Sequence, residues 1–396
     1  MKEETNMSYD FSFIPNRRGS GSPKWKAIEM NSEYANAFPF STADMEWGTA
    51  PAIREACVEF SKKGFFCYTE PDETYRKVVC DFMSRRHNWN IKPEWIVCTY
   101  GIVSTINTAV RCFTNEGDGI IIQRPVYYPF TAAIVNNNRK VANNALVLKD
   151  GKYTINFEEL EALCKDENNK MMIICSPHNP VCRVWTKEEL TKVADLCYEN
   201  NILLVSDEIH FDITKNRHYV LTSLDEKYNK NTIVCTAASK SFNIAGLSTS
   251  NIIIANDELR KQFSAQISRD GYSCINCVAY PATIAAYTKC DEWLDEMNSQ
   301  LNRNFKILKE YLKENLPEVR MAEHEGTYLA WLNVSCLGIS DDELVDYFSK
   351  NAGIIPSSGT WFGEEGSGFI RLNIAVPTQV LLDALSRLRK LADSRK

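Results

Sequence analysis

Three short stretches of this sequence carry side chains that could do chemistry. Asn179 lies in SPHNP, Asp207 and His210 lie in SDEIH, and Lys240 lies in CTAASKSFNIAGL. Each stretch comes at or directly after a short apolar run of the kind that forms buried strands. Because ligands bind outside the carboxyl ends of the strands in an open parallel sheet, we expect an amide, a carboxylate, an imidazole and an amine to share one site.

Each of these residues also has a plain structural interpretation. An Asp after a strand often caps a helix or a turn, and Asn-Pro usually marks a turn. A lone His is more often a structural residue than a ligand, and a lone Lys is usually solvated. We favour the shared site because the polar groups recur at successive strand ends.

Pyridoxal 5'-phosphate (PLP) is a cofactor that needs this set of groups. It requires a lysine for covalent attachment, a carboxylate that keeps its pyridine nitrogen protonated, and an anion site for its phosphate. A fourth strand end is predicted to supply the anion site, because TYGIVST, residues 99–105, places a glycine turn before a predicted helix. The free backbone N–H groups at such a helix start can hold a phosphate.

Apolar runs rich in Ile and Val alternate with helical patterns from residue 95 onward, which predicts an α/β fold with a mostly parallel central sheet and helices on both faces. Between two of the runs, Thr186 and Glu189 are spaced as a helix capping box. The candidate strands are 95–98, 119–123, 171–175, 202–206, 232–236 and 251–255.

The pattern changes beyond about residue 280, where a long amphipathic stretch ends at Pro317 and shorter mixed elements follow. One of them opens with a second candidate capping box, Ser340 to Glu343. We therefore expect a large domain over 51–285, and a linker helix with a small α+β domain over 286–396. Residues 1–50 are expected to pack on the small domain.

Composition excludes several classes of protein. The net charge of −6 on 396 residues argues against nucleic acid and anionic membranes as partners. No apolar run approaches the roughly 20 residues of a membrane span. Fourteen scattered cysteines and the lack of a secretory signal pattern predict a cytoplasmic protein with free thiols. Cys274 and Cys277 have no zinc-spaced partners, so no metal site is expected.

The motifs SPHNP, SDEIHFDI and ASKSFNIAGL, in this order and spacing, resemble those of the fold-type I aminotransferase superfamily of PLP enzymes. More closely, the chain resembles the MalY/PatB-type branch of C-S β-lyases, which are cystathionine β-lyase-like. The similarity extends over nearly the whole chain, from NRRGSGSPKW and ADMEW to GTWFGEEGSGFIRLNIAVP. It implies the fold-type I architecture and a homodimer whose active sites are shared across the interface.

The resemblance also assigns roles around the cofactor ring. Lys240 would be the covalent anchor and the base that removes the substrate's α-proton, and Asp207 would pair with the pyridine nitrogen. Asn179 and His210 would reach the 3'-oxygen. Tyr127 would stack on the ring, with Tyr128 as the less favoured alternative.

For the phosphate, the resemblance implies the backbone of Gly101, Ile102 and Val103, the hydroxyl of Ser239, and Tyr68 reaching across from the partner subunit. Arg371 in FIRLN would bind the substrate's α-carboxylate, because its planar fork matches a carboxylate. Without the family context, a salt bridge at the strand edge is an equal interpretation of Arg371.

Four positions depart from the family pattern. Ser248 stands where many members place an arginine against the phosphate, and Ser176 stands where asparagine is common. Cys67 and Cys182 replace glycines, so we expect their two turns to be reshaped, since glycine often serves backbone angles that other residues avoid. These departures affect substrate preference more than the cofactor chemistry.

The resulting hypothesis is a β-elimination that cleaves L-cystathionine, L-cysteine or another cysteine S-conjugate to a thiol, pyruvate and ammonia. An aminotransferase is the leading alternative, because the same lysine, carboxylate and arginine serve both reactions. A lyase with an additional regulator-binding role is a lower alternative, because fold does not imply function.

Overall fold

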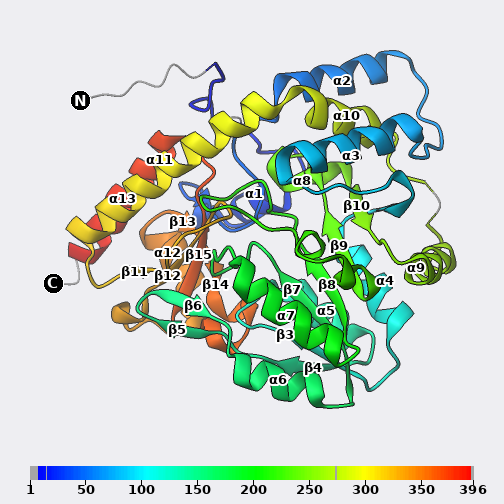
Figure 1. The fold of residues 1–396 in the computed structure, drawn as a ribbon. Helices are drawn as coiled ribbons and strands as arrows, with labels where there is room; N and C mark the ends of the chain where they lie inside the picture. Colours follow the sequence, from blue (N-terminus) through cyan, green and yellow to red (C-terminus); the bar gives the residue numbers. More distant parts are fainter. Residues whose placement is uncertain (1–7, 15, 273, 394–396) are drawn as a thin grey trace.

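A seven-stranded mixed sheet forms the centre of the molecule, in a computed structural model that describes residues 8–14, 16–272 and 274–393. All neighbouring pairs are parallel except those of β10, which runs antiparallel to both of its neighbours (Figure 1). The mostly parallel sheet is therefore confirmed. In spatial order the strands are β2 (Ile96–Thr99), β10 (Ser250–Ile253), β9 (Thr232–Thr236), β8 (Leu203–Asp207), β7 (Asn169–Cys175), β3 (Gly119–Ile122) and β4 (Lys140–Asn143).

Helices cover both faces of this sheet, as predicted. Alternate residues of a strand point to opposite faces, so Ile120 and Ile122 of β3 join one core cluster while Ile121 joins the other. The first face packs on α4 (Ile102–Phe113), α5 (Tyr128–Asn136) and α9 (Asp257–Arg269). The second packs on α3 (Glu73–His87), α6 (Phe157–Lys165), α7 (Lys187–Glu199) and α10 (Ala279–Lys289).

A second, four-stranded antiparallel sheet lies beside the first (Figure 1). Its strands, in order, are β11 (Arg320–Met321), β12 (Leu329–Asn333), β15 (Phe369–Asn373) and β14 (Ser357–Ser358). The long α11 (Asp291–Asn315) packs against α13 (Thr378–Asp393), and α12 (Asp341–Asn351) precedes β13 (Ile354–Ile355). In the part of the chain that the structure describes, no helix combines the length and hydropathy needed to cross a membrane.

The N-terminal part of the chain contacts this second region. After α1 (Pro23–Met30), the strand β1 (Phe38–Pro39) pairs in parallel with β13. The chain then passes between the two sheets and enters α2 (Pro51–Lys62). The domain boundaries at residues 50 and 285 stay predictions.

The two predicted capping boxes have different outcomes. At Thr186 the box is confirmed, with reciprocal hydrogen bonds to Glu189. At Ser340 the prediction is wrong, because the Ser340 hydroxyl donates to the Glu343 carboxylate at 2.6 Å and accepts nothing from the helix backbone. The sequence pattern is the same, but here the Glu343 carboxylate accepts from the Ser340 hydroxyl instead of from the Ser340 backbone N–H.

Candidate active site

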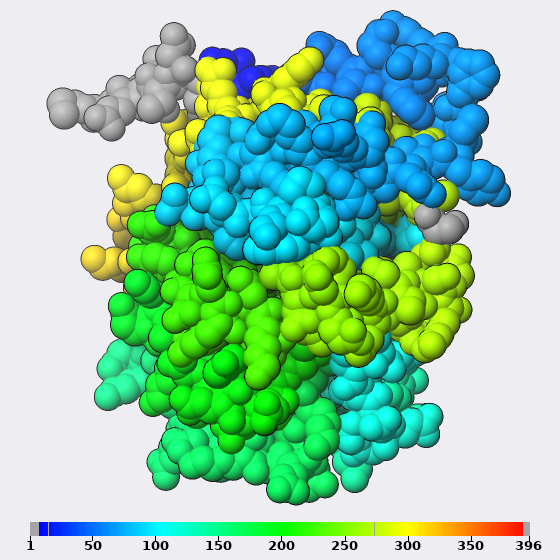
Figure 2. All heavy atoms as spheres, turned by 45° about the vertical axis from the view of Figure 1, so that its right-hand side comes forward, coloured from blue at the N-terminus to red at the C-terminus, as the bar shows by residue number. Residues whose placement is uncertain are grey.

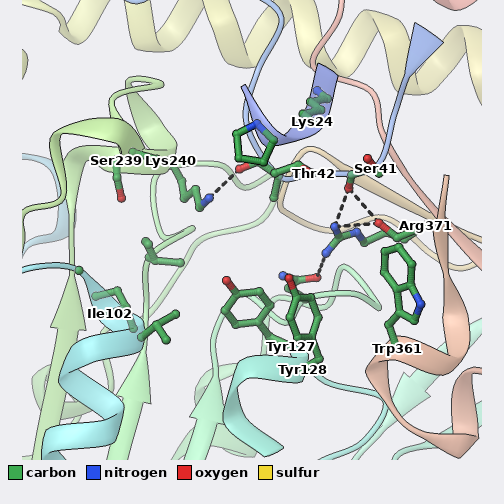
Figure 3. Close-up of a pocket in the computed structure, with 18 of the residues that line it drawn as sticks. Lys24, Ser41, Thr42, Ile102, Tyr127, Tyr128, Ser239, Lys240, Trp361 and Arg371 are labelled. Atoms are coloured by element: carbon green, nitrogen blue, oxygen red, sulfur yellow. Dashed lines mark hydrogen bonds between the residues drawn. The ribbon is translucent and has the colours of Figure 1, made fainter. Parts of the chain in front are cut away.

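A cavity of about 530 Å³ opens where the carboxyl ends of β2, β7, β8 and β9 meet. Residues from the second sheet and from the N-terminal segment close its other side (Figure 3). All but one of the predicted site residues line it; the lining ones are Gly101, Ile102, Val103, Tyr127, Asn179, Asp207, His210, Ser239, Lys240 and Arg371.

Lys240 lies in the short helix α8 (Ala238–Ser241) that follows β9, and its amine points into the cavity (Figure 3). The Nζ atom donates a hydrogen bond of 2.6 Å to the carbonyl oxygen of Ala43. Burial lowers the pKa of Lys240 to about 8, and the charge of Arg371 acts in the same direction. A lysine with a pKa near physiological pH can serve as a base.

Asp207 ends β8 and is buried at the floor of the cavity. Its carboxylate accepts a hydrogen bond of 3.2 Å from the Ile209 N–H, and no cation lies within ion-pair distance of it among the described residues. Burial raises the pKa of Asp207 to about 7. A buried carboxylate without a cationic neighbour is suited to a ligand that brings its own positive charge.

This raised pKa predicts how pH affects protein prepared without cofactor. From pH 4 to 7 the folded chain keeps a proton on Asp207 that the unfolded chain has released, so the free energy of unfolding falls as pH rises. A shift of about 3 pKa units corresponds to ~4 kcal/mol. Urea unfolding at pH 5 and pH 8, between which ~3 kcal/mol of this change falls, checks it, and Asp207→Asn should flatten the profile. A wild-type profile as flat as that of the variant would contradict the expectation.

His210 lies on the loop that follows β8, within the same cavity. Its Nδ1 atom is buried and has no hydrogen-bond partner among the described residues. Burial holds the pKa of His210 well below its usual value, so its ring is neutral. Tyr127 forms the facing wall with Tyr128 beside it (Figure 3). The structure thus brings a neutral imidazole, an aromatic face and a buried carboxylate to one cavity.

The remaining end of the cavity is suited to an anion. Helix α4 begins at Ile102, and helix geometry leaves its first N–H groups without intrahelical partners. Gly101 before it has a φ of 115°, an angle that requires glycine, whereas a Cβ there would meet nothing within 4 Å. The hydroxyl-bearing residues Ser239 and Ser248 also line this cavity, and Ser248 holds the position where the resemblance leads us to expect an arginine.

Arg371 extends from β15 toward the same cavity and is buried. Its guanidinium donates to Asn179 Oδ1 at 3.0 Å and to the Ser41 carbonyl at 2.7 Å, while its Nε is buried and unpartnered. No carboxylate of the described residues lies within ion-pair distance of Arg371, so the salt-bridge interpretation is wrong. The arrangement leaves a buried, oriented cation available to a carboxylate ligand.

Tyr68 is the predicted site residue that the chain does not bring to the cavity. Its side chain is 95% exposed, in the segment that follows α2. The neighbouring Cys67 is also exposed. Nothing within a single chain tests a role for Tyr68 at a partner's site, so that role stays a prediction.

Cys182 has a backbone angle that glycine usually serves. Its φ is 65°, in the left-handed region, so this angle is reached without glycine, and the reshaping of the turn stays a prediction. The thiol is buried and donates to the Leu329 carbonyl at 2.8 Å, which offsets part of the cost of the left-handed backbone. Burial raises the pKa of Cys182 to about 12, which keeps the thiol protonated and unreactive.

The sequence did not indicate a five-residue strap, Ser41 to Met45, that crosses between the two sheets. Every carbonyl of the strap accepts a hydrogen bond from a side chain, and two of the donors are Lys240 and Arg371. The bonds are Arg371 to Ser41, Asn373 to Thr42, Lys240 and Tyr328 to Ala43, Lys24 to Asp44, and Asn243 to Met45. The strap is evident only in the folded structure, because most of its hydrogen-bond donors lie far from it in the sequence.

Comparisons with known proteins agree with this geometry. The family model described as aminotransferase class I and II matches residues 35–388. Cystathionine beta-lyase PatB of Bacillus subtilis is 38% identical over 375 residues, covering 94% of this chain and 97% of PatB. Protein MalY of Escherichia coli is 31% identical over 377 residues, covering 94% of this chain and 96% of MalY.

A solved structure is similar over the same extent. The crystal structure of cystalysin from Treponema denticola, which contains pyridoxal 5'-phosphate, superposes with a TM-score of 0.95 at 41% identity. The match covers 98% of this chain and 100% of that one.

Proposed function

We propose, from the premise that this chain belongs to the class I and II aminotransferase family, that it is a PLP-dependent carbon–sulfur β-lyase. The observation that carries the proposal is the joint burial of the Lys240 amine and the Asp207 carboxylate at one cavity. The relative cystathionine beta-lyase PatB, at 38% identity, favours the lyase over the aminotransferase. The substrate class is a cysteine S-conjugate, with L-cystathionine and L-cysteine as members.

The residues of the cavity fit PLP. Lys240 would hold it covalently, Asp207 would face its protonated ring nitrogen, and the start of α4 would take its phosphate. His210, whose Nδ1 has no partner in the described part of the chain, would face its 3'-oxygen together with Asn179. When bound, the cofactor supplies an electron sink for negative charge at the substrate's α-carbon.

Arg371 and Lys240 have separate roles toward the substrate. Arg371 binds the α-carboxylate of the substrate, and its bonds to Asn179 and the Ser41 carbonyl hold the guanidinium in orientation. The Lys240 Nζ takes the proton from the α-carbon. Because its pKa is lowered from 10.5 to about 8, far more of the amine is unprotonated near neutral pH than in an ordinary lysine, and this form can accept that proton.

Replacing Arg371 by lysine is expected to raise KM for L-cystathionine by about 10- to 100-fold, because hydrogen bonds to charged groups contribute ~1.5–3 kcal/mol and an ammonium lacks the guanidinium fork. Steady-state kinetics measure the effect. A cysteamine S-conjugate, which lacks the α-carboxylate, provides the control, because its KM should stay the same in both proteins. An equal rise for both compounds would contradict the role of Arg371.

A product assay tests the lyase directly. Purified holoenzyme given L-cystathionine should release equal amounts of pyruvate and free thiol without any added 2-oxo acid. If turnover instead required a 2-oxo acid and released neither product, the enzyme would be an aminotransferase and the proposed function would be wrong.

The homodimer is part of the proposal. The segment around α2 projects from one corner of the molecule (Figure 2, blue, upper right), and there Phe65 and Phe66 are 72% and 63% exposed beside Tyr68. Such an exposed aromatic group indicates an interaction surface. A second copy of the chain would cover it and receive Tyr68 at its cofactor phosphate.

Subunit mixing tests the shared site. Tyr68→Ala and Lys240→Ala homodimers should each have low activity, since each lacks one component of both sites. Random reassociation makes half of the dimers hybrids with one intact site, which restores roughly a quarter of the wild-type sites. If the mixture shows only the summed activity of its parents, Tyr68 does not act across the interface.

A further inference from the structure

A chain of buried hydrogen bonds lies behind Lys240, on the side away from the cavity. Ser241, the residue after Lys240, donates through its hydroxyl to Asp212 Oδ2 at 2.5 Å. The other carboxylate oxygen of Asp212 lies 2.9 Å from His87 Nε2. The three residues come from α8, from the loop after β8, and from the last residue of α3.

This chain of bonds connects the two segments that carry the site. Asp207, the last residue of β8, and His210, in the loop that follows, face the cavity, and Asp212 lies two residues beyond His210. Helix α8 holds Lys240 on the cavity side and Ser241 on the rear side. The Asp212 carboxylate therefore joins the loop of the ring-facing groups to the helix of the lysine.

The Asp212 and His87 side chains are buried, so their pairing carries a free-energy cost of desolvation that a surface contact does not. The Asp212 side chain is 1% exposed and that of His87 is 6% exposed. A buried carboxylate costs several kcal/mol of desolvation unless hydrogen bonds and a partner satisfy it. His87 is itself fixed by stacking on Phe211, with ring centroids 4.1 Å apart and planes 7° from parallel.

The nearby Glu208, which pairs with His218, has a different set of partners from Asp212. Glu208 contacts His218 Nε2 at 2.7 Å, Ser206 Oγ at 2.9 Å and the Leu221 N–H at 3.1 Å. These partners lie on β8 or on the segment that follows it, so Glu208 stabilises that segment internally. Asp212 alone of the two carboxylates reaches α8.

We propose that Asp212, held by His87, is a positioning residue that sets the place of Lys240 through the Ser241 hydroxyl. The proposal rests on the proposed function only in taking Lys240 as the residue that binds PLP. Loss of the chain of bonds should leave a folded protein whose lysine meets the cofactor in the wrong geometry.

The test is reconstitution of cofactor-free protein with PLP, followed by the violet absorbance band of lysine-bound PLP. Ser241→Ala and Asp212→Asn should weaken band formation about ten- to hundredfold, the expected effect of losing a buried charge-assisted hydrogen bond. Ser241→Thr keeps the hydroxyl and should restore it. Asp295→Asn is the matched control, because Asp295 lines the same second cavity as His87 and Asp212 and pairs with Arg86 at 2.7 Å, but its side chain is 62% exposed.

A second pair of variants changes His87, at the other end of this chain of hydrogen bonds, in case the first variants fail to fold. His87→Phe keeps the stacking on Phe211 and removes the donor to Asp212, whereas His87→Gln offers an amide donor. The first should weaken band formation and the second should preserve more of it.

Variants that melt earlier yet form the band like wild type would overturn the proposal, because their role would be structural only. The outcome is separable from the lyase assignment. Wild type that forms the band but cleaves no cysteine conjugate would refute the lyase alone.

Discussion

Replacement of Lys240 by methionine is expected to abolish the violet band with PLP and to lower kcat for pyruvate release by at least ~10³-fold, since a positioned general base alone contributes about 10²–10⁴-fold. Both results follow from one atom, because the same Nζ would anchor the cofactor and accept the α-proton. The other lysine that lines the cavity, Lys24, cannot substitute, because it is bound in ion pairs with Asp44 and Glu46.

The same substitution should stabilise protein prepared without cofactor. Burial lowers the pKa of Lys240 from 10.5 to about 8, so the protonated amine destabilises the folded state near pH 7. The difference of about 2.5 units corresponds to ~3 kcal/mol, part of which methionine would recover. Urea unfolding at pH 7 measures this, with exposed Lys309→Met as control. A persistent violet band, or reduced stability, would contradict the assignment.

Asp207→Asn is expected to have the second largest effect. The amide keeps the shape of the carboxylate but not its charge, and removing one partner of a buried ion pair costs ~3–5 kcal/mol. We therefore expect PLP binding or turnover to fall by about 10²–10³-fold, measured by cofactor titration and by pyruvate release. Asp207→Glu, which keeps the charge, should lose less.

The asparagine variant should show opposite changes in stability and activity. Protein prepared without cofactor gains stability at pH 8, because no buried carboxylate has to ionise there. If Asp207→Asn left PLP binding and turnover at wild-type values, Asp207 would not face the ring nitrogen. Active-site residues that lower stability while enabling function are a general pattern.

Much of the fold was predictable because buried strands leave a strong signal. The six apolar runs each contain a strand of the central sheet within about one or two residues. β4 was missed, since a half-exposed edge strand with the sequence KVAN has no continuous apolar run. The antiparallel direction of β10 was also not predictable, because burial on both faces looks the same in either direction.

The site residues likewise fall into those that the sequence predicts and those that it does not. Residues at strand ends, such as Asp207 and Lys240, were predictable because the strands place them at one edge of the sheet. Asp212 and Ser241 are 29 residues apart and belong to no periodic pattern, so their contact is evident only in the folded structure. Residue type alone does not predict the backbone at position 182, because Cys182 adopts a positive φ of the kind that glycine usually serves.

The strap from Ser41 to Met45 has a consequence for how this protein can be studied and how it can diverge. The hydrogen bonds that its five carbonyls accept use main-chain oxygens, which every amino acid provides. Alanine at Ser41, Thr42 or Met45 would therefore leave these bonds in place, whereas alanine at Asp44 would also remove ion pairs with Arg17 and Lys24. The side chains of the strap other than Asp44 could vary widely among homologues. Removing a single residue would instead eliminate one acceptor and shift its neighbours relative to donors on β15, on α1 and around α8. The strap should therefore tolerate most substitutions but not a deletion.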